Sequence, residues 1–167
     1  MEKKRLAYYS LNALLLGGLV TQFAYADSCP RFDDIAKNAD ARVQFMNHQK
    51  AIQYCASQGK RLPSIRELAQ LASSMGAAGI SETAKEGYFP INAINADGKV
   101  DNFYFSYSGY NSPANDLGKH WFWSSSFFSG QSNLACILSG HSGAVFYEEL
   151  DVEGNVALRC VVDCLTQ

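Results

Sequence analysis

The apolar and polar positions of this chain have the spacing of two short helices followed by several strands. His48, Ala51 and Cys55 recur three and four residues apart, so they share one face of a first helix. Asn47 is a good N-cap, because its side chain can accept a hydrogen bond from a free backbone amide of the first turn. Gly59 then ends this helix in the left-handed conformation that glycine adopts most easily.

A second helix begins after Pro63, which blocks any helix running through Arg61 and Leu62. Ser64 and Glu67 form a capping box, in which each side chain satisfies a free backbone amide at the other residue. The spacing therefore predicts a second helix starting at Ser64. Its buried stripe comprises Ile65, Leu68, Ala69, Leu71, Ala72 and Met75.

The last third of the chain consists of short apolar runs separated by glycines at hairpin spacing, which is typical of antiparallel strands. The predicted strands cover 121–125, 134–138, 144–149 and 156–162, and a short first strand covers 42–46. Two helices followed by an antiparallel meander indicate an α+β fold. We expect the two helices to pack on a twisted sheet.

Residues 80–119 are rich in Gly, Ser, Asn and Tyr and lack a long periodic segment. They predict a long irregular loop, which in a compact domain is usually functional or disordered, and the aromatic content argues against disorder. Residues 95–99 form a turn signal within it, and 103–107 a short strand. The polar residues 27–44 predict an N-terminal arm, so the folded domain spans 45–167.

The first 26 residues have the pattern of a cleaved signal peptide. A basic start at Lys3, Lys4 and Arg5 precedes an apolar run, and Ala24-Tyr25-Ala26 is a small-x-small cleavage signal. The run is shorter than the roughly 20 apolar residues of a membrane span. We expect export to the periplasm, the cell surface or the medium, with no membrane span in the mature chain. Lipidation at Cys29 is a weaker alternative.

Cleavage after Ala26 leaves 141 of the 167 residues, which suits one domain. Removing Lys3, Lys4, Arg5 and Glu2 from 14 basic and 16 acidic residues leaves 11 and 15, a net charge of −4. No basic face is visible, so nucleic acid and anionic lipid are not expected partners.

All five cysteines lie in the mature part, and an exported chain meets an oxidising compartment, so pairing is the default. Because the number is odd, one cysteine is free or pairs between chains. None forms a Cys-x-x-Cys motif, and Cys160 and Cys164 with three scattered histidines make a poor zinc pattern. We expect neither a metal nor a cofactor.

Four stretches resemble the C-type lectin-like fold, in the bacterial branch related to formylglycine-generating enzyme and to the C-terminal domain of a collagen-like adhesin. The matching stretches are Ala51-x-x-Tyr54-Cys55, Arg61-Leu62-Pro63-Ser64-x-x-Glu67-Leu68, Trp123-Ser124-Ser125 and Arg159-Cys160-Val161. They cover roughly residues 45–163. This fold hosts lectins, adhesins, protein binders and an oxidase, so the resemblance fixes no activity.

The resemblance implies a disulfide Cys55–Cys160 between the first helix and the final strand. Chain ends lie close together in that fold, which favours Cys29–Cys164 as a second disulfide. Cys136 would be left as a small buried hydrophobe. The structural residues of the matching stretches are Arg61, Pro63, Ser64, Glu67 and Trp123, with Arg61 pairing with backbone carbonyls or an acid beneath the loops.

The resemblance and the aromatic, Asn-rich segment together predict an exported recognition domain, such as an adhesin, that binds a glycan or a protein. Tyr and Trp offer rigid apolar area with a polar tip, and Asn offers adaptable hydrogen bonds. The alternative is that these aromatics pack the loop onto the sheet, as we expect for Phe103, Phe105 and Phe122. The predicted binding face comprises Tyr104, Tyr107, Tyr110, Asn111, Asn115, Asp116, His120 and Trp121.

A calcium site of the sugar-binding C-type lectins is not expected. That site needs a Glu-Pro-Asn or Gln-Pro-Asp loop and a Trp-Asn-Asp run for its oxygen ligands. Here residues 111–116 read Asn-Ser-Pro-Ala-Asn-Asp, and Trp123 is followed by two serines. Binding is therefore predicted to be calcium-independent.

Two further function classes stay open. An oxidoreductase similar to formylglycine-generating enzyme would need a cysteine pair, whereas Cys136 has no evident partner thiol or base. Nothing in the spacing of His120, His141 and the serines selects a nucleophile, so we expect no enzyme. A structural envelope or fibre-tip subunit that forms homo-oligomers is the other class, and Cys136 bridging two chains would favour it.

Overall fold

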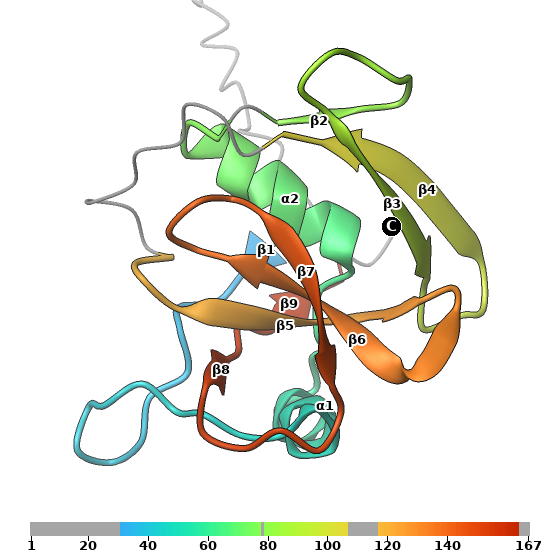
Figure 1. Ribbon diagram of the computed structural model, residues 1–167. Coiled ribbons are helices and arrows are strands. Elements are labelled where there is room, and N and C mark those ends of the chain that lie inside the picture. The colour runs from blue at the N-terminus through green and yellow to red at the C-terminus, as the bar shows by residue number, and fades with distance from the viewer. Residues whose placement is uncertain (1–30, 78, 107–116, 164–167) are drawn as a thin grey trace, which may run out of the picture.

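A computed structural model describes residues 31–77, 79–106 and 117–163, and these form an α+β fold with two helices on an antiparallel sheet (Figure 1). The helices are α1 (His48–Ser57) and α2 (Ile65–Ser74). The strands are β1 (Arg31–Phe32), β2 (Ile80–Ser81), β3 (Phe89–Ile94), β4 (Val100–Phe105), β5 (Trp121–Phe128), β6 (Gln131–Ser139), β7 (Val145–Glu149), β8 (Val156–Ala157) and β9 (Val161–Val162).

Both helices begin at the caps that the sequence predicts, and α1 ends before the predicted Gly59. Asn47 caps α1 by accepting a hydrogen bond from the backbone N–H of Lys50 (3.0 Å). Gly59 follows α1 with φ +68°, a conformation that favours glycine. In α2 the predicted capping box of Ser64 and Glu67 is present in both directions. Local side-chain chemistry therefore accounts for these two elements.

The larger sheet has the strand order β2-β4-β3-β5-β6-β7, and β8 pairs with the start of β5. Neighbours along this order are antiparallel, whereas β8 runs parallel to β5, with Trp121 opposite Val156. β1 and β9 form a separate two-stranded sheet. The predicted antiparallel meander is therefore correct for β5, β6 and β7 and wrong for β8.

The prediction that residues 80–119 form one long irregular loop is wrong for 89–105. Strands β3 and β4 form a hairpin there, and the predicted turn at 95–99 joins them, with a hydrogen bond from Asn95 N–H to Lys99 O (2.8 Å). Alternate residues such as Ile91 and Phe103 face the core, while Asn92 and Asn102 are exposed. The predicted strand at 103–107 overlaps β4, which begins three residues earlier.

The start of the described chain is part of the folded unit. The backbone N–H of Asp33 donates to Cys160 O (2.9 Å), and that of Ala36 donates to Leu158 O (3.1 Å). The predicted strand at 42–46 is wrong, because this segment forms only one isolated bridge, between Lys37 and Val43. Residues expected in an N-terminal arm therefore run alongside the C-terminal segment.

The predicted strand at 156–162 is two short strands, β8 and β9, separated by residues 158–160. The backbone oxygens of Leu158 and Cys160 accept hydrogen bonds from the N-terminal segment instead of from the larger sheet. The Nε of Arg159 donates to Asp33 O (2.6 Å). Competing partners from residues 33–36 thus interrupt a run that reads as one strand.

Strands β5 and β6 lie between two hydrophobic cores, with α2 on one side and α1 on the other (Figure 1). Phe122, Cys136 and Leu138 face the α2-side core, whereas Trp123, Ala135 and Ile137 face the α1-side core. Because successive side chains of a strand point to opposite faces, burial on both faces explains the unbroken apolar run at 134–138.

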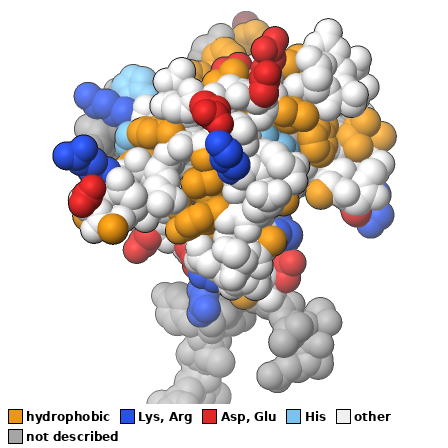
Figure 2. Space-filling model, turned by 90° about the horizontal axis from the view of Figure 1, so that it is seen from below, with side chains coloured by type: hydrophobic (Ala, Val, Ile, Leu, Met, Phe, Trp, Pro, Cys, Tyr) orange, Lys and Arg blue, Asp and Glu red, His pale blue; other side chains and the backbone are white. Residues whose placement is uncertain are grey.

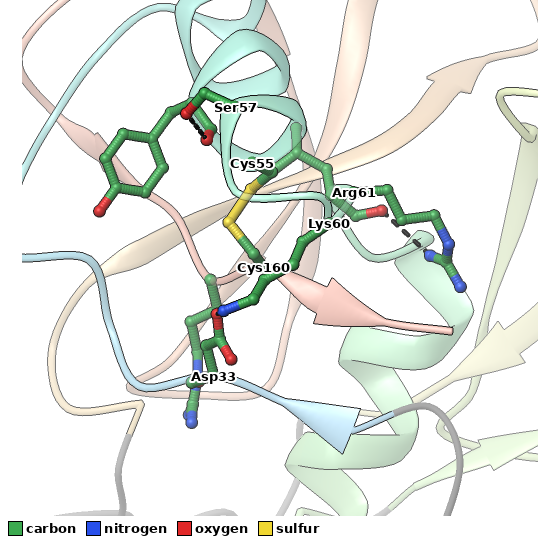
Figure 3. Close-up of a disulfide and its surroundings, with 9 residues drawn as sticks. Asp33, Cys55, Ser57, Lys60, Arg61 and Cys160 are labelled. Atoms are coloured by element: carbon green, nitrogen blue, oxygen red, sulfur yellow. Dashed lines mark hydrogen bonds and ion pairs between the residues drawn. A yellow bond between two sulfur atoms is a disulfide. The ribbon is translucent and has the colours of Figure 1, made fainter. Parts of the chain in front are cut away.

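The predicted disulfide Cys55–Cys160 is present, with its two Cα atoms 5.5 Å apart (Figure 3). It joins α1 to the segment before β9, across 105 residues of chain. Lys60 extends past it to form an ion pair with Asp33 (2.5 Å), while Arg61 points away from it. The predicted pair Cys29–Cys164 lies outside the described residues.

Candidate functional site

Three residues of the predicted binding face lie in the described part of the chain, and one of them, Tyr104, is far along the sheet from His120 and Trp121. Tyr104 lies on β4 opposite Ser81 and Pro90, towards the β2 end of the sheet. Trp121 lies at the start of β5, opposite Ser139 and Val156. Among the described strands, β4 connects to β5 through β3, and β3 pairs with the end of β5 that is far from Trp121. The remaining predicted residues Tyr107, Tyr110, Asn111, Asn115 and Asp116 lie outside the described residues.

Trp121 instead borders an open cleft of about 580 Å³, which we call the aromatic cleft. The rings of Trp121 and Phe146 meet edge to face, with centroids 5.0 Å apart. Phe146 is 48% exposed, so its ring is accessible to a ligand. The lining residues are Trp121, Ile137, Phe146, Tyr147, Glu148, Asn155 and Val156.

Sheet register brings these residues together. Phe146 of β7 lies opposite Ile137 of β6, and Trp121 of β5 lies two residues before Trp123, on the same face. Val156 of β8 flanks Trp121 on the other side. The aromatic cleft is therefore the open end of the face that the α1-side core covers further along β5 and β6.

His120 lies next to this site without joining its lining. Its ring packs on that of Phe45, with centroids 5.5 Å apart, and Phe45 is itself 40% exposed. Aromatic side chains therefore reach the surface on both sides of the start of β5. Figure 2 shows hydrophobic side chains at the surface between charged ones on the side of the molecule where α1 lies.

Glu148 of β7 supplies a carboxylate to the lining of the aromatic cleft. The side chain of the next residue, Glu149, points to the opposite face of the strand. In the described part of the chain Glu148 forms no ion pair with Lys or Arg. Its charge is therefore available to a ligand.

An irregular stretch in β5 forms hydrogen bonds with the loop that precedes α2. The pairing of β5 with β6 shifts register between Trp123 and Phe127. Within this stretch, Ser126 Oγ accepts a hydrogen bond from Ile65 N–H (3.0 Å), and Ser125 N–H donates to Pro63 O (2.7 Å). The serines of this stretch satisfy backbone groups and are thus structural.

His48 and Trp123 anchor α1 to the same stretch of β5. His48 is 2% exposed, and its Nε2–H donates to the carbonyl of Ser124 (2.8 Å). The indole N–H of Trp123 donates to Met46 O (2.7 Å). Burial lowers the pKa of His48 below its usual value, against the smaller opposing effect of that hydrogen bond. His48 is therefore a neutral packing residue.

Arg61 pairs with an acid, as the sequence suggests. It forms two hydrogen bonds of 2.8 Å to the carboxylate of Glu67 and a third contact, of 2.7 Å, to Asp163. Burial alone would raise the pKa of Glu67, but hydrogen bonds from Arg61 and Ser64 outweigh it and lower this pKa. A polar cleft of about 310 Å³ adjoins this pair, and the charges that line it are already matched.

Cys136 is a buried thiol, as predicted, and is 0% exposed in the α2-side core. Burial raises its pKa to about 12, so the thiol stays protonated at neutral pH. Neither nucleophilic chemistry nor a bridge to a second chain is favoured by this environment.

Within residues 31–77, 79–106 and 117–163, no group of three or more His, Cys, Asp or Glu side chains has the arrangement of a metal site. Among the same residues no helix has the length and apolarity needed to cross a membrane.

Sequence reasoning missed most of the aromatic cleft, because its lining comes from separate strands. Phe146 and Glu148 read as ordinary residues of a predicted strand, and Asn155 reads as part of a turn. One signal was available: Phe146 and Glu148 alternate with Tyr147 in a strand next to an acidic turn. Which face that alternation exposes depends on the pairing with β6.

Comparison of the chain with protein-family models, with curated proteins and with solved structures found no match.

Proposed function

We propose that this chain is an exported, non-catalytic recognition domain of the C-type lectin-like fold that binds a glycan or protein ligand in the aromatic cleft, without calcium. The observation that carries the proposal is the open cleft itself. Ligand sites are typically concave, mostly apolar and aromatic, with a few polar groups that orient the ligand. The aromatic cleft combines Trp121 and Phe146 with the carboxylate of Glu148 and the amide of Asn155.

Contacts between the family-like stretches support the proposed fold. The loop at Leu62 and Pro63 packs on the Trp-Ser-Ser stretch of β5, and Arg61 forms a backbone bridge with Val161. The disulfide ties the first stretch to the last. The two stretches at 51–68 thus contact the two later stretches of the chain and form one framework with them.

The test is binding of residues 27–167 to a glycan array and to a peptide array, each in calcium and in chelator. Because Phe146 is half-exposed on a strand, Phe146→Ala should remove ligand contact while the fold persists. Phe89→Ala is the matched control, because Phe89 is 46% exposed at the other end of the sheet.

Binding that survives chelation and is lost in Phe146→Ala but kept in Phe89→Ala is the expected result. Binding that disappears in chelator would show a calcium-dependent site and overturn this part of the proposal. If Phe146→Ala and wild type bind every array ligand equally, the cleft is not the recognition site.

A structural subunit that forms homo-oligomers is the competing proposal. Cys136 would give no bridge between chains without opening of the α2-side core. Comparing reducing with non-reducing gels checks this, because a disulfide-linked dimer under native conditions would favour the structural role. Thiol-dependent turnover in the presence of copper would favour the oxidoreductase alternative.

A further inference from the structure

The edge of the larger sheet runs beside the aromatic cleft. β7 is the last strand in the order β2-β4-β3-β5-β6-β7, so one side of it pairs with β6 and the other faces outward. Exposed edge strands are templates for pairing with an extended segment of another chain.

Hydrogen bonds at both ends of the β6–β7 pairing identify the outward-facing backbone groups. Leu150 N–H donates to Asn133 O, and Ser139 N–H donates to Ala144 O. Bonded pairs alternate along an antiparallel ladder, so Glu148 and Phe146 bond to β6. The N–H and C=O of Tyr147 therefore point away from β6.

Tyr147 is an open position of this edge, at its centre. Glu149 is already engaged, because its N–H donates to Glu148 Oε1 (3.1 Å) and its C=O accepts from Val152 N–H (3.3 Å). Among the described residues no backbone hydrogen bond reaches the outward N–H and C=O of Tyr147. A partner strand can pair with both groups.

The side chains next to this edge favour a positively charged ligand. Phe146 and Glu148 flank Tyr147 on β7 and both line the aromatic cleft, so they point to one face. A cation over an aromatic ring is attracted to the ring face, and a nearby carboxylate adds to that attraction. Among the described residues Glu148 forms no ion pair with Lys or Arg, so its carboxylate can pair with a cation of the ligand.

We infer that the ligand is an extended segment of a protein partner that pairs with Tyr147 at the β7 edge. One Lys or Arg side chain of this segment lies against Phe146 and Trp121 and beside Glu148. A side chain on the neighbouring strand position reaches Phe146, because residues across two strands lie about 5 Å apart. This inference rests on the proposed function and names the ligand class of that site.

The probe is a fluorescein-labelled octapeptide in which Lys alternates with Thr, measured by fluorescence anisotropy with residues 27–167. Its counterparts carry Gln in place of every Lys, or N-methyl groups on alternate backbone amides. We expect the Gln peptide to bind about twofold to thirtyfold more weakly, the range of one cation–aromatic contact. Binding of the Lys peptide should weaken in about 0.5 M NaCl.

Two variants test the residues. Glu148→Gln removes the charge, and the glutamine can still accept the hydrogen bond from Glu149 N–H. This variant should bind the Lys peptide more weakly and the Gln peptide unchanged. Phe146→Ala should weaken the binding of both peptides. Glu86→Gln and Phe89→Ala are matched controls on the β2 side of the sheet and should change neither.

The outcomes separate this inference from the proposed function. Equal binding of Lys and Gln peptides, or no effect of Glu148→Gln, overturns the cationic ligand even if Phe146→Ala still weakens binding. Full binding of the N-methylated peptide overturns the edge pairing. A glycan that binds through Phe146 while the Lys peptide does not bind leaves the proposed function standing and rejects the peptide. No dependence on Phe146 in any assay rejects both.

Discussion

The two faces of strands β5 and β6 are stabilised in different ways. The α2 side is a closed apolar core, in which Leu68, Phe122 and Leu138 are each fully buried. The α1 side combines apolar packing with a disulfide, a buried histidine and an indole hydrogen bond, and it opens into the aromatic cleft. The face that carries the candidate site is the one with directional and covalent constraints.

This difference has a physical reason. Close packing stabilises a face only where apolar side chains contact one another. Residues that line a ligand cleft make fewer such contacts. Covalent and hydrogen-bonded constraints can hold neighbouring strands in place without filling the space between them. The α1 side thus remains ordered although Trp121 and Phe146 stay open to solvent.

The largest effect is expected from removing the disulfide of the α1 side. Cys55→Ser with Cys160→Ser should lower the free energy of unfolding by about 4–5 kcal/mol in the chain-entropy model, because the bond closes a long loop. Urea unfolding with and without reductant measures it. Cys136→Ala is the control on the α2 side, and its unfolding should remain sensitive to reductant. A loss below about 1 kcal/mol in the double variant would contradict the covalent role.

The next largest effect is expected on the α2 side. Leu68→Ala removes a fully buried side chain and leaves a cavity, so it should destabilise the protein by about 3 kcal/mol. Leu150→Ala, which truncates a partly buried leucine on the α1 side, should cost clearly less. Urea unfolding of the two variants compares the loss of stability on the two faces. An equal loss of unfolding free energy in both variants would contradict the contrast between a closed and an open core.

Between pH 7 and pH 5, a pH effect on stability is expected from the α1 side. The pKa of His48 is lower in the folded than in the unfolded chain, so the unfolded chain takes up a proton more readily as pH falls below about 6.5. Melting temperature should therefore fall between pH 7 and pH 5, beyond the fall seen in His48→Gln. That variant keeps a donor for Ser124 O but does not titrate. Parallel pH profiles of the two proteins would show that His48 is not responsible.

The smallest effect on stability is expected in the cleft. Phe146 is half-exposed but contacts the ring of Trp121, so Phe146→Ala should lower the free energy of unfolding by about 1 kcal/mol. Urea unfolding of this variant beside Phe89→Ala measures it. A large loss for Phe146→Ala alone would mean that the ring holds β7 in place instead of facing a ligand.

Local sequence determined the elements whose signals lie within a few residues. The N-cap of α1, the capping box of α2 and the turn at 95–99 each depend on neighbours in the chain, and each is present. The hairpin at 89–105 was harder to predict, because Asn92 and Asn102 have low strand propensity although their exposed positions fit the alternation. Composition then suggested a loop where a hairpin forms.

Only tertiary structure decided which residues share a surface. The parallel pairing of β8 with β5 and the position of β7 at the sheet edge place Val156, Trp121 and Phe146 around one cleft. The same topology carries Tyr104 to the other end of the sheet. Strand register and strand order depend on contacts between distant segments, and a pattern read along one segment holds no information about them.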